Sequence, residues 1–323
     1  MRSFHFSWLI TAVVAALAPI AAAQAEYPEK LLRWILTQPP GGANDILARP
    51  LAQRLSEQIG QPVVIDNRGG AGGNLGADLA AKSPPDGYTL VMLGVMHAMG
   101  ASLYKKLSYN LTRDFTPVTL LAASPGVLVV HPTLPVKSVK ELIALAKAKP
   151  GQLTYSSSGN GTPNHLQAGL FSYLTGVEMV HVPYKGGGPS MIGLISGEAS
   201  LSFASMPSSI AYIRSGKLKA IAVTTAHRSP STPSLPTISE AGVPGYEAET
   251  WFGLSVPAGV PKEIIARLHA EMLKVLKAPD VIKQLDQAGY QARTSTPEEG
   301  AAFTRSEIEK WAKVVKAADM HAD

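Results

Sequence analysis

The sequence contains no cysteine. Without thiols the protein can form no disulfide and no cysteine-based zinc site, it offers no thiolate nucleophile, and it lacks the residue that anchors a bacterial lipoprotein to its lipid. Charged residues are also sparse, at 16% of the chain, and the basic ones are dispersed and often alternate with acidic ones. A nucleic-acid-binding surface would instead cluster basic residues with aromatic ones, so we expect no nucleic-acid partner.

Motifs for catalysis, metals and cofactors are missing as well. No two histidines of the mature chain lie four residues apart, and neither H-E-x-x-H nor a Gly-Lys-Ser/Thr phosphate loop occurs. The segment closest to a nucleophile elbow, Gly253–Pro257, lacks the final glycine of G-x-S-x-G. We therefore expect no catalytic residue, no metal ion and no cofactor. The glycines between Gly69 and Gly76 do not form G-x-G-x-x-G, and they predict either a wall of a ligand site or a plain turn.

Long apolar runs are absent except at the N-terminus. There, Arg2 precedes an apolar stretch from Trp8 to Ala23 and an A-x-A site that ends at Ala25. This pattern predicts a signal peptide over residues 1–25, with an uncleaved anchor as the less favoured alternative because no positive flank follows. Removing it leaves 28 basic and 24 acidic residues, a net charge of +4. We expect an exported protein that resides in the periplasm.

Apolar strands alternate with amphipathic helices, which predicts an α/β fold with a largely parallel sheet. Two capping boxes, Ser138 with Glu141 and Thr296 with Glu299, mark helix starts. The predicted strands are Leu32–Thr37, Val63–Ile65, Tyr88–Leu93, Val118–Ala122, Gly126–Val130, Leu153–Ser156, Met179–Val182, Ala199–Phe203 and Leu218–Thr224. The predicted helices are Asp45–Ile59, Leu75–Ala81, Val139–Lys147, Pro163–Leu174 and three closing helices that start near Pro261, Pro279 and Pro297.

Two glycine-rich turns, each between a strand and a helix, are the most informative motifs. The first spans Gln38–Asp45, and the second spans Gly159–Thr162. A helix N-terminus presents unpaired N–H groups and the positive end of the helix dipole, and glycine lets a ligand approach the backbone closely. Two such turns, one in each half of the chain, predict a cleft that grips an anion from both sides. Asp45 is either a helix cap or a general base, with the cap the more frequent role.

Segments along nearly the whole mature chain match one family in order and spacing. They include Pro40-Gly41-Gly42 with Asp45 and Arg49, Gly70-Ala71-Gly72-Gly73-Asn74, Pro85-Asp86-Gly87-Tyr88-Thr89-Leu90, Gly161-Thr162 with His165-Leu166, Val182-Pro183-Tyr184-Lys185-Gly186 and Trp251-Phe252-Gly253. With these motifs the chain resembles the tripartite tricarboxylate transporter substrate-binding proteins, known as the Bug family.

The resemblance implies a two-lobed periplasmic binding protein of the type II-like kind, each lobe a mostly parallel sheet flanked by helices. Lobe 1 would comprise residues 26–125 and 250–323, and lobe 2 residues 126–249. The partner would be a two-component membrane permease, and we expect a monomer. The ligand would be a small mono-, di- or tricarboxylic acid, including aromatic acids.

The resemblance also implies the site residues. Gly41, Gly42, Ala43, Asn44 and Asp45 would form one jaw, Ser158, Gly159, Asn160, Gly161, Thr162 and His165 the other, with Tyr184, Lys185 and Gly186 beside them and Ala204 and Ser205 at the far end of the ligand. Many relatives carry an aspartate after the strand that ends at Phe203, so we hypothesise a ligand without an amine. A ligand sensor that docks to a membrane kinase, and an exported hydrolase that uses Ser158 or Asp45, are the alternative functions.

Overall fold

The computed structural model describes residues 27–229 and 232–317. The predicted signal peptide lies outside these residues. Within the described part of the chain, no helix is both long enough and apolar enough to cross a bilayer.

The first half of the chain begins with parallel strands and the helices that follow them. Its elements are β1 (Leu32–Leu36), α1 (Ala43–Ile59), β2 (Val63–Asn67), the 3₁₀ turn η1 (Ala71–Gly73), α2 (Asn74–Ala81), β3 (Thr89–Gly94), α3 (Val95–Leu103) and β4 (Phe115–Val130). The next elements are α4 (Val139–Ala148), β5 (Thr154–Ser157), α5 (Pro163–Thr175), β6 (Val180–Pro183), α6 (Gly187–Ile195), β7 (Leu201–Ser205), α7 (Met206–Arg214) and β8 (Lys219–Val223). The chain closes with β9 (Glu249–Pro257), α8 (Lys262–Lys277), α9 (Pro279–Gln287), β10 (Gln291–Ala292) and α10 (Pro297–Ala317).

All strands join one sheet in the order β2-β1-β3-β9-β4-β7-β5-β6, with β8 and β10 also paired to β4. The α/β fold is confirmed, but the expectation of a mostly parallel sheet is wrong in detail. The pairs β1–β2, β1–β3, β5–β6 and β5–β7 are parallel, whereas every pair that involves β4 or β9 is antiparallel. The two segments predicted as separate strands on either side of Pro125 form the single strand β4.

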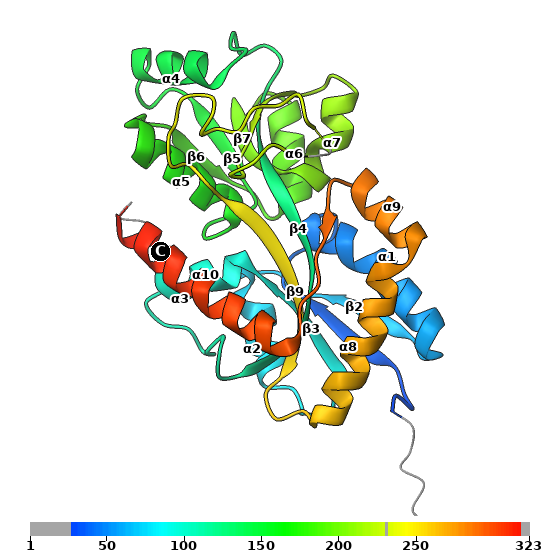
Figure 1. Cartoon of the computed structure of the whole chain (residues 1–323). Helices are drawn as coiled ribbons and strands as arrows, with labels where there is room; N and C mark the ends of the chain where they lie inside the picture. Colours follow the sequence, from blue (N-terminus) through cyan, green and yellow to red (C-terminus); the bar gives the residue numbers. More distant parts are fainter. Residues whose placement is uncertain (1–26, 230–231, 318–323) are drawn as a thin grey trace, which may run out of the picture.

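Strands β4 and β9 run between two helix-flanked halves of the molecule (Figure 1). Helices α4 to α7 surround one half, and α1 to α3 with α8 to α10 surround the other (Figure 1). Strand β4 pairs with β9 up to Pro125 and with β7 and β8 from Gly126 onward. Trp34 and Leu254 lie in an apolar core confined to one half, and Met191 and Ile210 in one confined to the other. A third apolar cluster, which includes Val91 and Phe203, joins residues of both halves.

Several local sequence signals are confirmed. Gly60 ends α1 in the left-handed conformation, with φ of 70°. Thr296 and Glu299 form the reciprocal bonds of a capping box at distances of 2.8 and 3.1 Å. Helix α1 starts at Ala43, before the predicted Asp45, because Gly42 is its N-cap, and it continues through Pro50.

Candidate functional site

Five helix N-termini meet between the two halves. Helices α1, α3, α5, α6 and α7 each follow a strand, and residues from the N-cap or first turn of all five line one chamber. The first N–H groups of a helix have no partner within it, so such a chamber is surrounded by free donors and positive dipole ends. It lies where ligands bind in open α/β sheets, at the carboxyl ends of parallel strands.

The cleft has two connected parts, which share Gln38, Met96 and Ser158. The inner chamber, about 540 Å³ including its opening, is lined by Gln38, Gly42, Ala43, Asn44, Leu93, Gly94, Val95, Met96, Ser158, Pro163, Asn164, Gln167, Gly187, Phe203, Ser205, Ser208, Thr250, Trp251 and Phe252. The outer chamber, about 1470 Å³, is lined by Thr37, Gln38, Pro39, Gly69–Gly73, Met96, Tyr104, Ser158, Gly159, Asn160, Thr162, Pro183, Tyr184, Lys185 and Gly186. The outer chamber is the larger of the two.

The inner chamber is polar without being charged. Among the described residues that line it, none is Asp, Glu, Lys, Arg or His. Ser158, Ser205 and Ser208 supply hydroxyls, and Gln38 and Asn164 supply amides, while Lys185 lies in the outer chamber. Backbone donors and neutral side chains can hold an anion here. The part of the chain that the structure covers also holds no group of three or more potential metal ligands.

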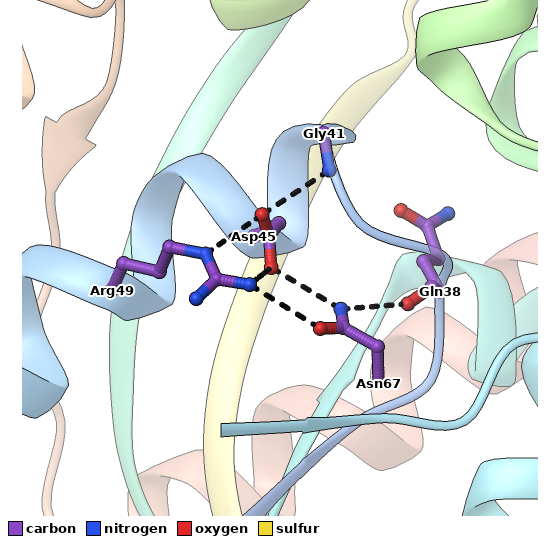
Figure 2. Close-up of polar contacts among 5 residues, drawn as sticks. All are labelled: Gln38, Gly41, Asp45, Arg49 and Asn67. Atoms are coloured by element: carbon purple, nitrogen blue, oxygen red, sulfur yellow. Dashed lines mark hydrogen bonds and ion pairs between the residues drawn. The ribbon is translucent and has the colours of Figure 1, made fainter. Parts of the chain in front are cut away.

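The Asp45 carboxylate serves the first glycine turn (Figure 2). Its Oδ2 accepts from the Gly41 amide at 3.1 Å and from Arg49 Nε at 2.9 Å. Its Oδ1 accepts from Arg49 at 2.8 Å and from Asn67 Nδ2 at 3.2 Å, and Asn67 in turn donates to the Gln38 carbonyl at 3.0 Å. Burial opposes the charged form, but these hydrogen bonds outweigh it and lower the pKa of Asp45. An ionised carboxylate thus holds the turn from behind.

Two stacked histidines support the second glycine turn. The rings of His165 and His181 are 4.2 Å apart and nearly parallel, and Tyr155 stacks on the other face of His181 at 4.8 Å. His165 Nδ1 accepts from the Gly161 amide at 3.2 Å, and His181 Nε2 lies 2.6 Å from the Ser157 hydroxyl. Burial lowers the pKa of His165, and burial together with His165 lowers that of His181 to about 4. Both rings are therefore neutral at neutral pH.

The cleft brings together most of the residues that the sequence and the resemblance indicate. Gly42, Ala43, Asn44, Ser158 and Ser205 line the inner chamber, and Ser158, Gly159, Asn160, Thr162, Tyr184, Lys185 and Gly186 line the outer one. Five indicated residues line neither part: Gly41, Asp45, Gly161, His165 and Ala204.

Each of these five has a structural reason to lie outside the linings. Gly41 and Asp45 bond to one another, Ala204 is buried in the core of its half, and His165 stacks on His181. Gly161 is covered by Tyr104, whose Oη would lie 2.5 Å from a Cβ at position 161. The glycines Gly69–Gly73, whose role the sequence left open, form a wall of the outer chamber.

Sequence reasoning missed the lining residues that come from β3, α3, α6 and β9 and some of those from α5 and α7. These are Leu93–Met96, Asn164, Gln167, Gly187, Ser208 and Thr250–Phe252. The signal that could have found part of this set is the end of β3, which leads into a helix just as β1 and β5 do. That stretch is buried on all sides, so it shows neither the helical nor the strand period.

Comparisons with known proteins agree with this arrangement. Residues 47–320 match the family model described as "Tripartite tricarboxylate transporter family receptor". Protein BugT of Bordetella pertussis is 37% identical over 311 residues, which cover 96% of this chain and 94% of BugT. The solved structure of R. palustris Rpa4515 with adipate superposes with a TM-score of 0.89, at 38% identity, over 92% of this chain and 99% of that one.

A second solved structure is MatC from Rhodopseudomonas palustris with bound malate. It gives a TM-score of 0.85 at 30% identity over 90% of this chain and 100% of that chain. The family model covers most of the chain, and BugT aligns along nearly all of it. The chain therefore belongs to the tripartite tricarboxylate transporter receptor family, whose solute-binding members include the Bug proteins.

Proposed function

We propose that the protein is a periplasmic receptor that captures a small carboxylate in the inner chamber and delivers it to a tripartite tricarboxylate-type permease. The observation that carries this proposal is the convergence of five helix N-termini on a chamber with no charged lining residue among those described. Such a chamber favours an anion through N–H groups and dipoles, without a fixed cation. The adipate bound to Rpa4515 and the malate bound to MatC support a carboxylate.

The ligand that we propose carries no ammonium group. An ammonium would need a carboxylate partner once it left water. No acidic side chain lines either chamber in the described residues, and Asp45 is already bonded to Arg49 and Asn67. Ala204 is buried in the strand core and Ser205 offers only a hydroxyl, which supports the hypothesis made from the sequence.

We also propose that the two halves act as lobes with boundaries near Pro125–Gly126 and Ala248–Glu249. The change of partners within β4 at Gly126 and the start of β9 at Glu249 support these boundaries. Ligand would reach the inner chamber from the outer one, between Gly69–Gly73 of one lobe and Tyr184–Gly186 of the other. The expectation of a monomer rests on the resemblance alone and stays a prediction.

Thermal unfolding of the mature protein with a panel of carboxylates tests the function. Ligand at about 100 times its Kd adds about 2.7 kcal/mol to the stability of the folded state, which raises Tm by several degrees. Mono-, di- and tricarboxylic acids and the matching amines form the panel. A rise with at least one acid and none with the amines is expected. If no acid raises Tm, the proposed function is wrong.

A pair of glycine variants locates the site. Gly42→Val places a branched side chain in the lining of the inner chamber, with the nearest other group 3.5 Å from the new Cβ, so folding should survive while the shift with ligand disappears. Gly188→Val is the control, since a Cβ there meets nothing within 4 Å and the residue lines neither chamber. A full response of Gly42→Val to the acid would contradict the placement of the site.

A further inference from the structure

Three residues line both parts of the cleft: Gln38, Met96 and Ser158. Since the two linings share no other residue that the structure describes, these three form the neck where the inner chamber opens into the outer one. The thioether of Met96 has no proton to donate. The Ser158 hydroxyl donates its only proton to Asn164 Oδ1 at 3.0 Å. Gln38 is therefore the neck residue whose side chain has N–H groups to offer a ligand.

The backbone of Gln38 is firmly hydrogen-bonded, whereas its side-chain amide is not. The Gln38 carbonyl accepts from Asn67 Nδ2 at 3.0 Å, and the side chain points away from that bond (Figure 2). Its Nε2 lies 3.5 Å from Met96 Sδ, and a thioether sulfur is a weak acceptor. Within the described part of the chain the amide has no other hydrogen-bond partner, so a ligand oxygen would replace only this weak bond.

The amide of Gln38 lies at the boundary between the two chambers. Its Oε1 is 3.5 Å from the position of a Cβ on Gly42, which lines only the inner chamber. Its neighbour Met96 has its methyl group 2.6 Å from the position of a Cβ on Gly73, which lines only the outer chamber. Gln38 is half-buried, so a charged group that it binds keeps part of its hydration.

A second carboxylate of the ligand fits this neck better than the inner chamber. The described lining of the inner chamber contains no cation, so two anions inside it would repel each other without compensation. The neck opens into the outer chamber, where Lys185 is the one cationic residue of the described lining. An amide N–H also bonds more strongly to a charged acceptor than to a neutral one.

Building on the proposed function, we propose that Gln38 determines specificity for the outer end of the ligand, because its Nε2 donates to the second carboxylate of a dicarboxylic acid. The first carboxylate then lies in the inner chamber, and the second lies at the neck. A methyl group at the outer end would leave the amide with Met96 Sδ alone. An ammonium group there would meet Lys185 and no acidic side chain of the described linings. Both should bind more weakly than the diacid.

Isothermal titration with two matched sets of acids tests the inference. The sets are succinate, butyrate and 4-aminobutyrate, and adipate, hexanoate and 6-aminohexanoate, so each compares a carboxylate, a methyl and an ammonium group at the outer end. In at least one set the wild-type protein should bind the diacid about tenfold or more tightly than the other two. Gln38→Met keeps the length of the side chain and removes its amide, so the ratio of diacid to monoacid affinity should fall about tenfold. Gln152→Met, at an exposed position outside the cleft, is the matched control and should keep the ratio.

A charge change at the same position separates direct contact from a structural role. Gln38→Glu places a carboxylate at the neck, so the diacid should bind more weakly than the monoacid of its set, and the amino acid should gain affinity. Loss of a structural contact would instead weaken binding of all three compounds together. Because the amide has only Met96 Sδ as its partner, neither variant at position 38 should lower Tm without ligand.

Three results would overturn this inference and leave the proposed function standing. They are equal affinity for diacid and monoacid in both sets, failure of both diacids to bind while another acid of the panel binds, and a preference that survives Gln38→Met. An equal loss of all three compounds in Gln38→Glu, with a lowered Tm, would also overturn it. Absence of binding by these compounds and by the wider carboxylate panel would overturn both proposals.

Discussion

At the scale of single residues, the cleft separates the side chains that line it from those that hold the lining in place. The family resemblance implies that Asp45 contacts the ligand, and its position after two glycines also suits a helix cap or a general base. In the structure it is instead the acceptor that connects Gly41, Arg49 and Asn67 behind the turn. The Gly41 amide is thus used inside the turn, while Gly42 and Ala43 line the inner chamber.

Asp45→Asn should destabilise the protein by about 2 kcal/mol at pH 7, because it replaces charge-assisted bonds by neutral ones. The folded pKa of Asp45 lies below its usual value, so its contribution is present at neutral pH and is lost as the pH falls through that lowered pKa. Urea unfolding at pH 7 and pH 3 checks this: the gap between wild type and variant should shrink at pH 3. Glu178→Gln, at an exposed position, serves as the control. An unchanged gap would show that the charge of Asp45 is not what holds the turn.

At the scale of elements, the unit formed by β5, α5 and β6 carries a second support for the cleft. The stacked rings of His165 and His181 connect the start of α5 to β6, and the Gly161 amide donates to the first of them. Protonation of His165 at Nδ1 would remove the acceptor for that amide, and charging both rings would repel them at 4.2 Å.

Stability should therefore fall as the medium becomes acidic. The unfolded histidine takes up a proton near its usual pKa of about 6.5, while the folded pKa of His181 is about 4, so folding becomes progressively less favourable from pH 6.5 down to about 4 and then levels off. His181→Phe keeps a stacking ring and removes the titration. Denaturant midpoints at pH 7, 5.5 and 4.5 should depend less on pH for His181→Phe than for the wild type. The control is His227→Gln at an exposed position, whose midpoints should follow those of the wild type.

Elements with a strong local signal were predictable, and those defined by tertiary packing were not. The capping box at Thr296 and the glycine stop at Gly60 encode their helix ends locally. Helices α6 and α7, by contrast, escaped prediction because Gly187 and Pro207 near their starts read as loop residues. The direction of β9 cannot be derived from its own residues, since its partners are 124 or more positions away, as in the pairs Pro125–Glu249 and Thr116–Val256.

The same limit applies to the site. The two glycine turns carry their signal in the sequence, so Gly42 and Gly159 were found. Trp251 and Phe252 join the chamber through β9, and no local pattern indicates that β9 pairs with β4.

At the scale of the whole molecule, the two halves touch through glycines. Tyr104, just after α3 in one half, places its hydroxyl where a side chain on Gly161 of the other half would lie, and a Cβ on Gly187 would lie 3.6 Å from the Cα of Gly42. These contacts leave no room for a methyl group at Gly161. The two halves can therefore approach each other this closely only because residue 161 is a glycine.

Gly161→Ala should hold the halves apart, because its Cβ would lie 2.5 Å from Tyr104 Oη. We expect the affinity for the captured acid to fall about tenfold, in line with the cost of overpacking. A larger radius of gyration in solution scattering with ligand should accompany the loss. Since Gly161 has a φ of +72°, alanine also strains the backbone, and Tyr104→Phe separates the two effects by removing only the hydroxyl. The double variant should regain part of the affinity; no recovery would mean that backbone strain alone is responsible.

The pairing of β4 with β9 also has a consequence for the order in which the two halves fold. Strand β9 lies between β3 and β4 at the centre of the first half, yet it is made only after 248 of the 323 residues. The pairs of the other half, from Gly126 to Val223, come from one continuous stretch of chain. Contacts between distant segments form slowly because a long loop must close first. A nascent chain can thus complete the half built from residues 126–223 first. The edges of β3 and β4 that pair with β9 remain unpaired until β9 has been made.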